Sequence, residues 1–366
     1  MGFNCGIVGL PNVGKSTLFN ALTATEAAEA ANFPFTTIEP NVGRVAVPDE
    51  RLDAVARVAG PERTVPTQLE FVDIAGLVEG ASRGEGLGNR FLANIREVDA
   101  VCHVLRCFED ANVAHVTGAA DPVNDAAVVA TELMLADLES LEKRTDGLTK
   151  RARGGDKDAA AELALAEAAQ ELLAAGRPAR ALAREPADEK PFRGLGLLTA
   201  KPVLYVLNVD ETAAATGNAL SQAAARMAAD EGSQAVVISA RIEEEIAGLD
   251  QAEERAAFIA DLGLEETGLQ RVIRAGYGLL DLITFFTANE REAHAWTVRR
   301  GAKAPEAAGR VHTDFEKGFI AVEAIPWDAY VELGGEGPAR DAGKMRTEGR
   351  DYEVRDGNVL LFRFNA

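Results

Sequence analysis

The sequence predicts an α/β fold in which a first domain with a mostly parallel sheet carries an inserted antiparallel helical hairpin and is followed by a small α+β domain. Three observations lead to this prediction: a complete phosphate-binding loop near the N-terminus, alternating strand and helix patterns behind it, and short β-rich segments after residue 281. Alternating strands and helices are typical of a parallel sheet that helices cover on both faces.

The phosphate-binding loop is the segment Gly9–Ser16, whose letters GLPNVGKS satisfy the pattern GxxxxGK[ST]. An apolar strand, Cys5–Val8, precedes it, and a helix-forming run, Thr17–Leu22, follows it. Such a loop binds phosphate because its glycines let the backbone curl, so that successive N–H groups and the helix N-terminus point at one anion. We therefore expect Lys15 to reach the β- and γ-phosphates and Ser16 to bind Mg²⁺.

Apolar runs at regular intervals predict the strands of the sheet. They are Phe3–Val8, Leu69–Val72, Asp99–Phe108, Pro202–Leu207 and Ala235–Ser239.

A long interruption, residues 125–200, separates the third and fourth strands and predicts two amphipathic helices. Apolar residues recur at helical spacing on both sides of the turn supplied by Gly154 and Gly155. With about 25 residues in each arm, the hairpin would extend roughly 40 Å. Its tip is basic, which indicates either a nucleic-acid contact or an ordinary solvated helix surface; the residues are Lys143, Arg144, Lys150, Arg151 and Arg153.

The sequence therefore divides into a nucleotide-binding domain in two parts, residues 1–124 and 201–281, the inserted hairpin, residues 125–200, and a C-terminal domain, residues 282–366. In the C-terminal domain, turn residues separate five β-rich pieces, which are Leu282–Thr287, Ala295–Val298, Phe319–Ala324, Tyr352–Val354 and Val359–Phe364. This domain holds 12 Lys and Arg against 14 Asp and Glu. Its near-neutral charge is compatible with RNA.

Composition excludes several classes of protein. The 366 residues suffice for two or three domains, and their net charge of −20 argues against DNA binding and general wrapping of nucleic acid. The sequence has no apolar run of about 20 residues and no signal-peptide pattern, so we expect a cytoplasmic protein without a membrane partner. The three cysteines have no metal-binding spacing and are expected to be reduced core thiols.

Two further motifs accompany the phosphate-binding loop. Asp73 and Gly76 belong to DIAG, at the end of a predicted strand, where a carboxylate holds Mg²⁺ and a backbone N–H meets a γ-phosphate. Thr37 lies between the two motifs, where a switch loop supplies a Thr to the metal. Four glycines between residues 80 and 88 predict a second switch.

The base-binding motifs depart from those of GTPases. The segment Asn208–Glu211 reads NVDE in the place of NKxD, and Ser239 with Ala240 occupies the place of the SAK motif. The final Asp of NKxD accepts hydrogen bonds from guanine, and here Glu211 stands there, one methylene longer. Val209 replaces the Lys that flanks the base. Selection of guanine is therefore in doubt.

Together, GLPNVGKST, NFPFTTIEPN, DIAGLVEGASRGEGLGN and NVDE resemble the YchF family of ribosome-associated ATPases, a branch of the Obg-related P-loop GTPases. The resemblance covers nearly the whole chain. It implies a G domain with an inserted helical hairpin, a C-terminal β-grasp domain of the TGS type, hydrolysis of ATP with altered base specificity, Mg²⁺, and binding to ribosomes or their subunits through rRNA and ribosomal proteins.

Carried onto this chain, the resemblance places nucleotide contacts on the loop from Asn12 to Thr17 and on Asn208 and Val209, and Mg²⁺ on Ser16 and Thr37. The full set of expected nucleotide contacts is Asn12, Val13, Gly14, Lys15, Ser16, Thr17, Gly76, Asn208, Val209, Glu211, Ser239 and Ala240.

Hydrolysis lacks its usual water-positioning group, because Leu77 follows DIAG where Ras-like enzymes have Gln. His115, in a predicted loop, is the candidate that would accept a hydrogen bond from the attacking water. The alternative is a surface histidine without a role. Asn12 is a further candidate, since in some related G proteins an Asn at this position ligates K⁺. His103 lies within an apolar strand and is expected to be a satisfied core residue.

Several functions remain open at this point. The leading hypothesis is an ATP-hydrolysing switch that acts on ribosomes. A true GTPase, in which Glu211 reads guanine, is the first alternative, and a nucleotide-gated RNA- or ribosome-binding module with incidental hydrolysis is the second. A P-loop kinase is the most distant, because no lid rich in Arg follows the motifs.

Overall fold

A computed structural model describes residues 3–30, 41–74, 87–110, 120–249 and 251–365. The chain forms two compact units. The first contains Met1–Val45 and Glu70–Leu279, and the second contains Ala46–Leu69 and Leu280–Ala366. Within the described ranges, no helix is long and apolar enough to cross a membrane.

The first unit is built on a six-stranded sheet in the order β2-β4-β1-β5-β6-β7. Four of the five neighbouring pairs, from β4 to β7, are parallel. Every residue of β5 is buried, as expected for a central strand that helices cover on both faces. The strands are β1 (Asn4–Val8), β2 (Val42–Ala46), β4 (Gln68–Asp73), β5 (Ala100–Arg106), β6 (Val203–Asn208) and β7 (Gln234–Ile238).

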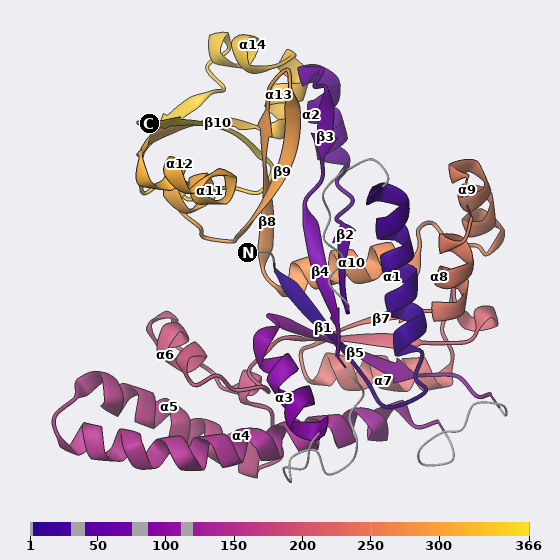
Figure 1. The fold of residues 1–366 in the computed structure, drawn as a ribbon, viewed down its shortest axis with the longest axis vertical. Coiled ribbons are helices and arrows are strands. Elements are labelled where there is room, and N and C mark those ends of the chain that lie inside the picture. Colours follow the sequence, from indigo (N-terminus) through magenta and orange to yellow (C-terminus); the bar gives the residue numbers. More distant parts are fainter. Residues whose placement is uncertain (1–2, 31–40, 75–86, 111–119, 250, 366) are drawn as a thin grey trace. The chain divides into compact units, whose positions relative to one another are not determined.

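Helices of the first unit alternate with these strands (Figure 1). Several end in glycines whose left-handed backbone suits a C-terminal turn, for example Gly232 after α7 and Gly263 after α9. The helices are α1 (Lys15–Ala30), α3 (Leu87–Glu97), α4 (Pro122–Arg153), α5 (Lys157–Ala174), α6 (Glu189–Gly194), α7 (Ala219–Asp230), α8 (Ala240–Ala247), α9 (Ala252–Asp261) and α10 (Gly268–Leu279), with short 3₁₀ turns η2 (Ala179–Ala181), η3 (Pro186–Asp188) and η4 (Glu211–Ala213).

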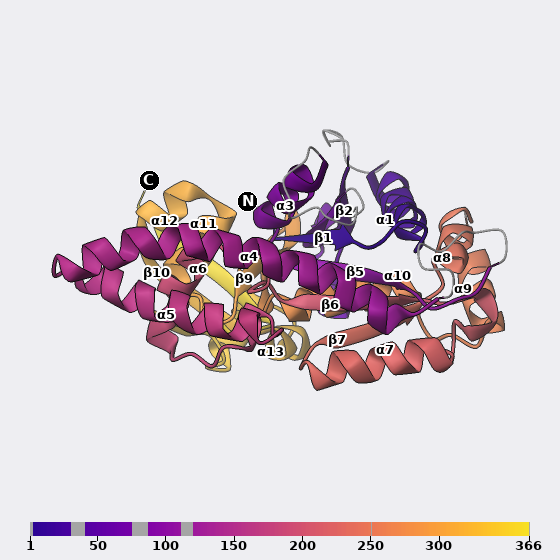
Figure 2. The same ribbon diagram turned by 90° about the horizontal axis from the view of Figure 1, so that it is seen from below.

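The long helices α4 and α5 lie side by side as a hairpin (Figure 2). Each begins with an Asp whose side chain accepts a hydrogen bond from a backbone N–H of the first turn, Asp121 for α4 and Asp156 for α5. Gly155, with φ +89°, makes the turn between them, a conformation that glycine adopts without strain. The interface is apolar and includes Leu141 and Ala166.

A buried carboxylate holds the base of this hairpin. Asp137 of α4 accepts hydrogen bonds from the backbone N–H groups of Leu198 and Thr199, both at 2.8 Å, and from the Thr199 hydroxyl at 2.7 Å. Burial raises the pKa of Asp137, and the hydrogen bonds oppose that effect. Close by, the Lys201 ammonium donates to the carbonyl oxygen of Arg96, at 3.0 Å, and to that of Val98, so it satisfies the end of α3.

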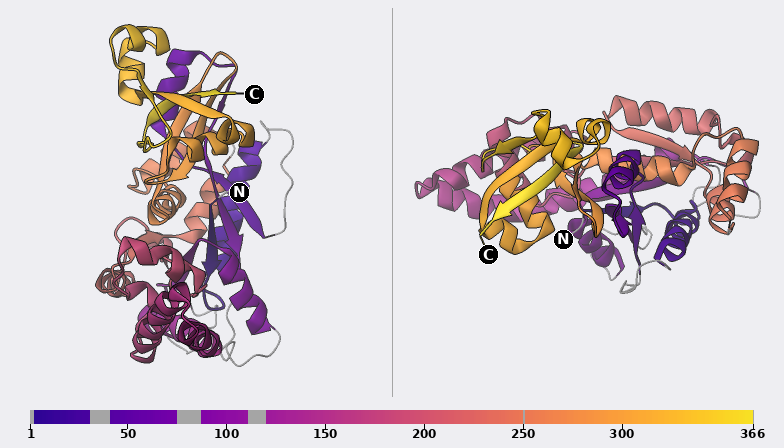
Figure 3. Two further views of the ribbon diagram at one scale, coloured as in Figure 1. Left: turned by 90° about the vertical axis from the view of Figure 1, so that its left-hand side faces the viewer. Right: turned by 90° about the horizontal axis from the view of Figure 1, so that it is seen from above.

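The second unit is a six-stranded sheet in the order β11-β10-β12-β8-β9-β3. Its orange and yellow strands lie side by side (Figure 3). The antiparallel pair β8–β9 and the parallel pairing of β12 with β8 give a β-grasp arrangement. The elements are β3 (Arg63–Val65), β8 (Leu282–Ala288), β9 (Glu292–Arg299), β10 (Phe319–Pro326), β11 (Arg346–Glu348), β12 (Asn358–Phe364), α2 (Glu50–Ala59), α11 (Ala304–Val311), α12 (Thr313–Lys317), α13 (Trp327–Leu333) and α14 (Glu336–Asp341).

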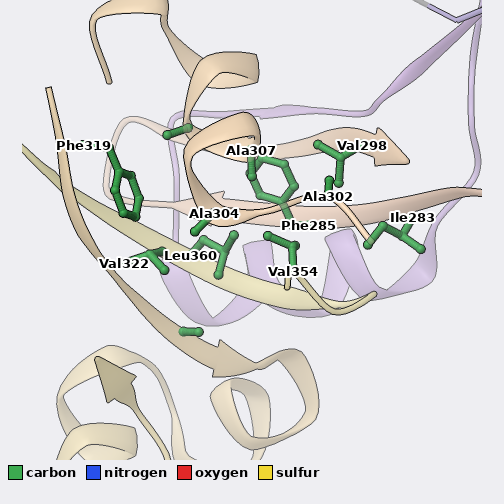
Figure 4. Close-up of a cluster of buried hydrophobic side chains, with 12 residues drawn as sticks. Ile283, Phe285, Val298, Ala302, Ala304, Ala307, Phe319, Val322, Val354 and Leu360 are labelled. Carbon is green, nitrogen blue, oxygen red and sulfur yellow. The ribbon is translucent and has the colours of Figure 1, made fainter. Parts of the chain in front are cut away.

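Both faces of this second sheet are covered, because successive strand residues point to opposite sides. Phe285 packs with Ala307 of α11 in the cluster that Figure 4 shows. Phe286, the next residue, packs instead with Leu52 and Val55 of α2. The hydrophobic cores on the two faces of the sheet therefore both contain side chains of β8.

The helix α2 shows that the second unit is not confined to the C-terminal sequence. Arg51 of α2 forms hydrogen bonds to Asp49 and, at 2.7 Å, to Asp356, and these carboxylates raise its pKa. The predicted assignment of residues 1–124 to the nucleotide-binding domain therefore differs from the structure over Ala46–Leu69. The reason is long-range: the apolar face of α2 is buried against strands more than 200 residues away, which its own sequence does not indicate.

The C-terminal strand predictions were partly wrong. Tyr352–Val354 is not a strand, and Glu353 makes only an isolated bridge to Lys303. The outermost strand beside β10 is β11, which was not predicted because its residues are polar and largely exposed. The four short helices of the C-terminal part were also not predicted individually.

Candidate functional site

The phosphate-binding loop leaves the end of β1 and enters α1, as the motif requires. Asn12 and Gly14 have positive φ angles of 64° and 91°. A Cβ atom at Gly14 would overlap the side-chain amide of Asn208, so this position requires glycine for space as well as for conformation. Loops curled in this way turn successive backbone N–H groups toward one anion.

Lys15, the first residue of α1, forms an ion pair with Asp73 at the end of β4. The two side chains are 13% and 20% exposed, so the pair is partly shielded from solvent. The predicted phosphate-binding cation and the predicted metal-binding carboxylate are therefore neighbours, although 58 residues separate them in sequence. Two groups with these roles must both approach the same triphosphate and its metal.

Asn208, at the end of β6, joins two loops of the site. Its Nδ2 atom donates a hydrogen bond to the carbonyl oxygen of Val13 at 2.9 Å, and its Oδ1 atom accepts one from the backbone N–H of Ala240, also at 2.9 Å. The side chain is buried, with the residue 4% exposed. One N–H of the amide is left for a ligand, since the amide carries two donors.

The residues after Asn208 have separate tasks. Val209 is buried in the core. Asp210 caps the short turn η4: it accepts a hydrogen bond from Ala213 N–H at 3.2 Å, and a hydrogen bond from Thr212 lowers its pKa. Glu211 is 47% exposed, and its Oε1 atom lies 2.9 Å from Nε of Arg241 in α8. Both carboxylates line the cavity, Asp210 hydrogen-bonded to its own turn and Glu211 paired with Arg241.

Ser239, between β7 and α8, is 2% exposed. Its hydroxyl makes no hydrogen bond to any residue that the structure describes. A buried hydroxyl without a partner is costly, so such a group beside a cavity is well suited to bind a ligand.

These segments enclose one cavity of about 920 Å³. It extends from the phosphate-binding loop to the loops after β5, β6 and β7, at the carboxyl ends of the parallel strands, where α/β proteins bind their ligands. Its lining residues are Leu10, Pro11, Asn12, Gly14, Lys15, Ser16, Thr17, Phe108, Glu109, Asp110, Asn208, Val209, Asp210, Glu211, Thr212, Ser239, Ala240, Arg241 and Glu244.

Most of the predicted nucleotide contacts line this cavity. Val13 does not: its side chain is buried, and its carbonyl oxygen accepts the hydrogen bond from Asn208. Thr37, Gly76 and His115 lie outside the described residues, as does Leu77.

Several lining residues were not predicted. Phe108 follows β5 and lies 4.7 Å below the guanidinium of the buried Arg106. Arg241 directly follows Ser239 and Ala240, in the place of the Lys of SAK. Both residues could have been predicted from their positions after β5 and β7, because residues at the carboxyl ends of adjacent parallel strands gather at one edge of a sheet.

Among the histidines, His103 is a core residue, as expected, but it is not satisfied. Its Nε2 atom has no hydrogen-bond partner among the described residues. Burial, with a smaller effect of Arg180, lowers the pKa of His103 to about 4. His294 and His312 lie in the second unit. The three cysteines are buried free thiols.

The donor set suits a hard divalent cation bound together with phosphate. Ser16 offers an exposed hydroxyl at the cavity, and Asp73 offers a carboxylate beside Lys15. No cluster of three or more His, Cys, Asp or Glu side chains that could hold a metal occurs in the described part of the chain. Mg²⁺ keeps waters and phosphate oxygens as ligands and needs few from the protein, so these residues fit it.

Comparison with protein families gives two matches. Residues 4–138 match a family described as 50S ribosome-binding GTPase, and residues 282–365 match the YchF-GTPase_C family, described as a protein of unknown function.

Comparison with individual proteins agrees with these families. The chain is 54% identical over 366 residues to the ribosome-binding ATPase YchF of Escherichia coli O157:H7 and 49% identical over 368 residues to that of Bacillus subtilis, with all of each chain covered. Among solved structures, that of the Schizosaccharomyces pombe YchF GTPase is similar, with a TM-score of 0.89 and 37% identity over 99% of this chain and 98% of the other.

Proposed function

This chain belongs to the YchF family of P-loop nucleotide hydrolases, and from this premise we propose that it hydrolyses ATP in preference to GTP and binds ribosomes or ribosomal subunits. The observation that carries the proposal is the single cavity that joins the phosphate-binding loop to the segments around Asn208 and Ser239. The phosphates and the base of one nucleotide would therefore bind in the same cavity.

The preference for adenine rests on the groups that face the base. Guanine presents an acceptor at position 6 and donors at N1 and N2, whereas adenine presents a donor at position 6 and an acceptor at N1. The N–H of Ala240 is engaged by Asn208, so it is not a free donor for guanine O6. The place of the guanine-reading Asp holds Glu211, which is one methylene longer. Both features weaken the recognition of guanine.

In the phosphate region, Lys15 would neutralise the β- and γ-phosphates, and the loop N–H groups would hold them in place. Ser16, Asp73 and Thr37 are the residues proposed to hold Mg²⁺. When bound, Mg²⁺ supplies positive charge beside the phosphate oxygens. Gly76 is proposed to meet the γ-phosphate through its backbone N–H.

The attacking water needs a group other than Leu77. We assign this role to His115, whose neutral imidazole would accept a hydrogen bond from the water. Asn12 lines the cavity and is the proposed ligand for K⁺, which would add positive charge beside the phosphates.

The ribosome is the proposed partner because the family match and the named relatives share this property. The contact would involve rRNA and ribosomal proteins, through the hairpin tip and the C-terminal unit. Three basic residues of the tip already pair with carboxylates: Lys143 with Glu139, Arg144 with Glu162, and Arg151 with Asp156. RNA phosphates would have to compete with these carboxylates, so the tip would contribute modestly.

For the domains, we propose that residues 1–124, without Ala46–Leu69, and residues 201–281 act as a G domain, that residues 125–200 act as an inserted hairpin, and that residues 282–366 together with Ala46–Leu69 act as a TGS-like domain. The proposed location is the cytoplasm, where ribosomes are found.

Titration with fluorescent ATP and GTP analogues tests base preference. We expect a lower Kd for ATP. A Kd for GTP that is tenfold lower, a difference of about 1.4 kcal/mol, would favour the alternative that Glu211 reads guanine and that the protein is a GTPase.

Co-sedimentation with ribosomes tests the partner. Binding should differ between a non-hydrolysable ATP analogue and ADP if the protein is a switch. Equal binding in both states, together with negligible turnover, would favour a binding module with incidental hydrolysis.

A further inference from the structure

Arg241 and Glu211 form an ion pair at the base-binding end of the cavity. Glu211 begins the turn η4 after β6, and Arg241 is the second residue of α8 after β7. Their Nε and Oε1 atoms are 2.9 Å apart, and both residues line the cavity. Arg241 is the only ion-pair partner of Glu211 within the described part of the chain, whereas Arg241 also lies 3.8 Å from Oε1 of Glu245.

This ion pair changes the hydrogen-bonding groups that a nucleotide base would contact. An unpaired carboxylate at this edge accepts hydrogen bonds from N1–H and the 2-amino group of guanine, and it repels the N1 lone pair of adenine. A carboxylate already bound by a guanidinium is a weaker acceptor, because its lone pairs and charge are directed at the cation. Guanine therefore loses its best partner, and adenine is relieved of the repulsion.

We propose that Arg241 is a specificity-determining residue, which favours ATP by holding the Glu211 carboxylate in an ion pair and so withdrawing it from the base. The proposal deepens the ATP preference proposed above and rests on it. It differs from an explanation by side-chain length alone, since it makes the effect of Glu211 depend on a residue 30 positions later in the sequence.

The test is a double-mutant cycle read as the ratio of the two dissociation constants, Kd for GTP divided by Kd for ATP. This ratio cancels the general effect of removing a positive charge from the cavity, which changes the affinity for both nucleotides alike. In the full chain, Arg241→Ala should lower the ratio about fivefold, equivalent to about 1 kcal/mol, because Glu211 is released. The Arg241 side chain is 75% exposed, so its removal should leave the fold intact.

The second arm removes the carboxylate. In a Glu211→Gln background, Arg241→Ala should leave the ratio unchanged, since no carboxylate remains to be released. Glu245→Gln is the matched control: it removes the other carboxylate near Arg241, does not line the cavity, and should leave the ratio as it is.

Two outcomes would overturn the proposal: an unchanged ratio in Arg241→Ala, or an equal fall of the ratio with and without the Glu211 carboxylate. The wild-type ratio is a separate result. If it favours GTP, the proposed ATP preference fails, whereas the response to Arg241→Ala still shows whether the ion pair controls the choice of base.

Discussion

The side-chain amide of Asn208 donates a hydrogen bond to the carbonyl oxygen of Val13 at 2.9 Å, so the loop after β6 is attached directly to the phosphate-binding loop. The other end of the same amide accepts from Ala240. One buried side chain therefore holds three segments of the cavity together, and its loss should affect the site and the fold at once.

Asn208→Ala should reduce nucleotide affinity and lower the free energy of unfolding by about 2 kcal/mol, because it leaves a buried carbonyl and a buried N–H without partners. Asn208→Asp should also be harmful, since a carboxylate cannot donate to Val13. Calorimetric titration and urea denaturation measure the two effects. Unchanged affinity and stability would show that the two hydrogen bonds contribute little.

Lys15→Ala should abolish measurable affinity for triphosphate while the protein stays folded, because the ammonium lies at the cavity and adds little to packing. Circular dichroism checks the fold and fluorescent nucleotide titration checks binding. Lys190→Ala, at an exposed position of α6, is the control and should bind normally. Normal binding by a folded Lys15→Ala variant would contradict the assignment of the loop.

His115→Ala should lower turnover at least tenfold with little change in the Kd for ATP, the pattern of a group used mainly in the transition state. Single-turnover hydrolysis and equilibrium titration separate the two quantities. Equal turnover in the variant and the natural protein would return His115 to the alternative of a surface residue without a role.

His103 should make stability depend on pH. Its pKa is about 4 in the folded protein and about 6.5 when unfolded, so the unfolded state binds the proton first as pH falls. Above pH 6.5 the neutral His103 makes its full contribution to the free energy of unfolding. This contribution, up to about 3 kcal/mol, is lost as the pH decreases toward 4. His103→Phe, beside Tyr205, should flatten the dependence between pH 7 and 5. Urea denaturation across this range would show the same slope in both proteins if the prediction is wrong.

Asp137→Ala should destabilise the first unit by about 3 kcal/mol, because two backbone N–H groups and one hydroxyl lose their buried acceptor. Thermal denaturation measures this loss. Asp146→Ala, at an exposed position of the same helix, removes a carboxylate without such partners and should change stability by less than about 0.5 kcal/mol. Similar effects of the two substitutions would show that the base of the hairpin does not depend on Asp137.

The sequence was sufficient for the features that depend on local pattern. The loop Gly9–Ser16 needs glycine at set positions and a strand and helix on either side, and all of these are short-range properties. The hairpin of α4 and α5 followed from helical periodicity and from Gly155, since each helix shows its apolar face in its own residues. Five of the six strands of the first sheet were found from their apolar runs, whereas β2, Val42–Ala46, was not predicted.

Tertiary structure alone decided the features that depend on contacts between distant segments. The helix α2 belongs to the second unit because its apolar face is buried against β8 and β9. The local sequence of a helix shows which face is apolar but does not show which surface that face packs against. The pair of Lys15 with Asp73, the double attachment of Asn208 and the contact of Arg241 with Glu211 likewise join residues on different elements. Sequence determined which chemical groups this protein carries, whereas the order of strands in the sheet determined which of them meet, because parallel strands bring their carboxyl ends to one edge whatever their distance along the chain.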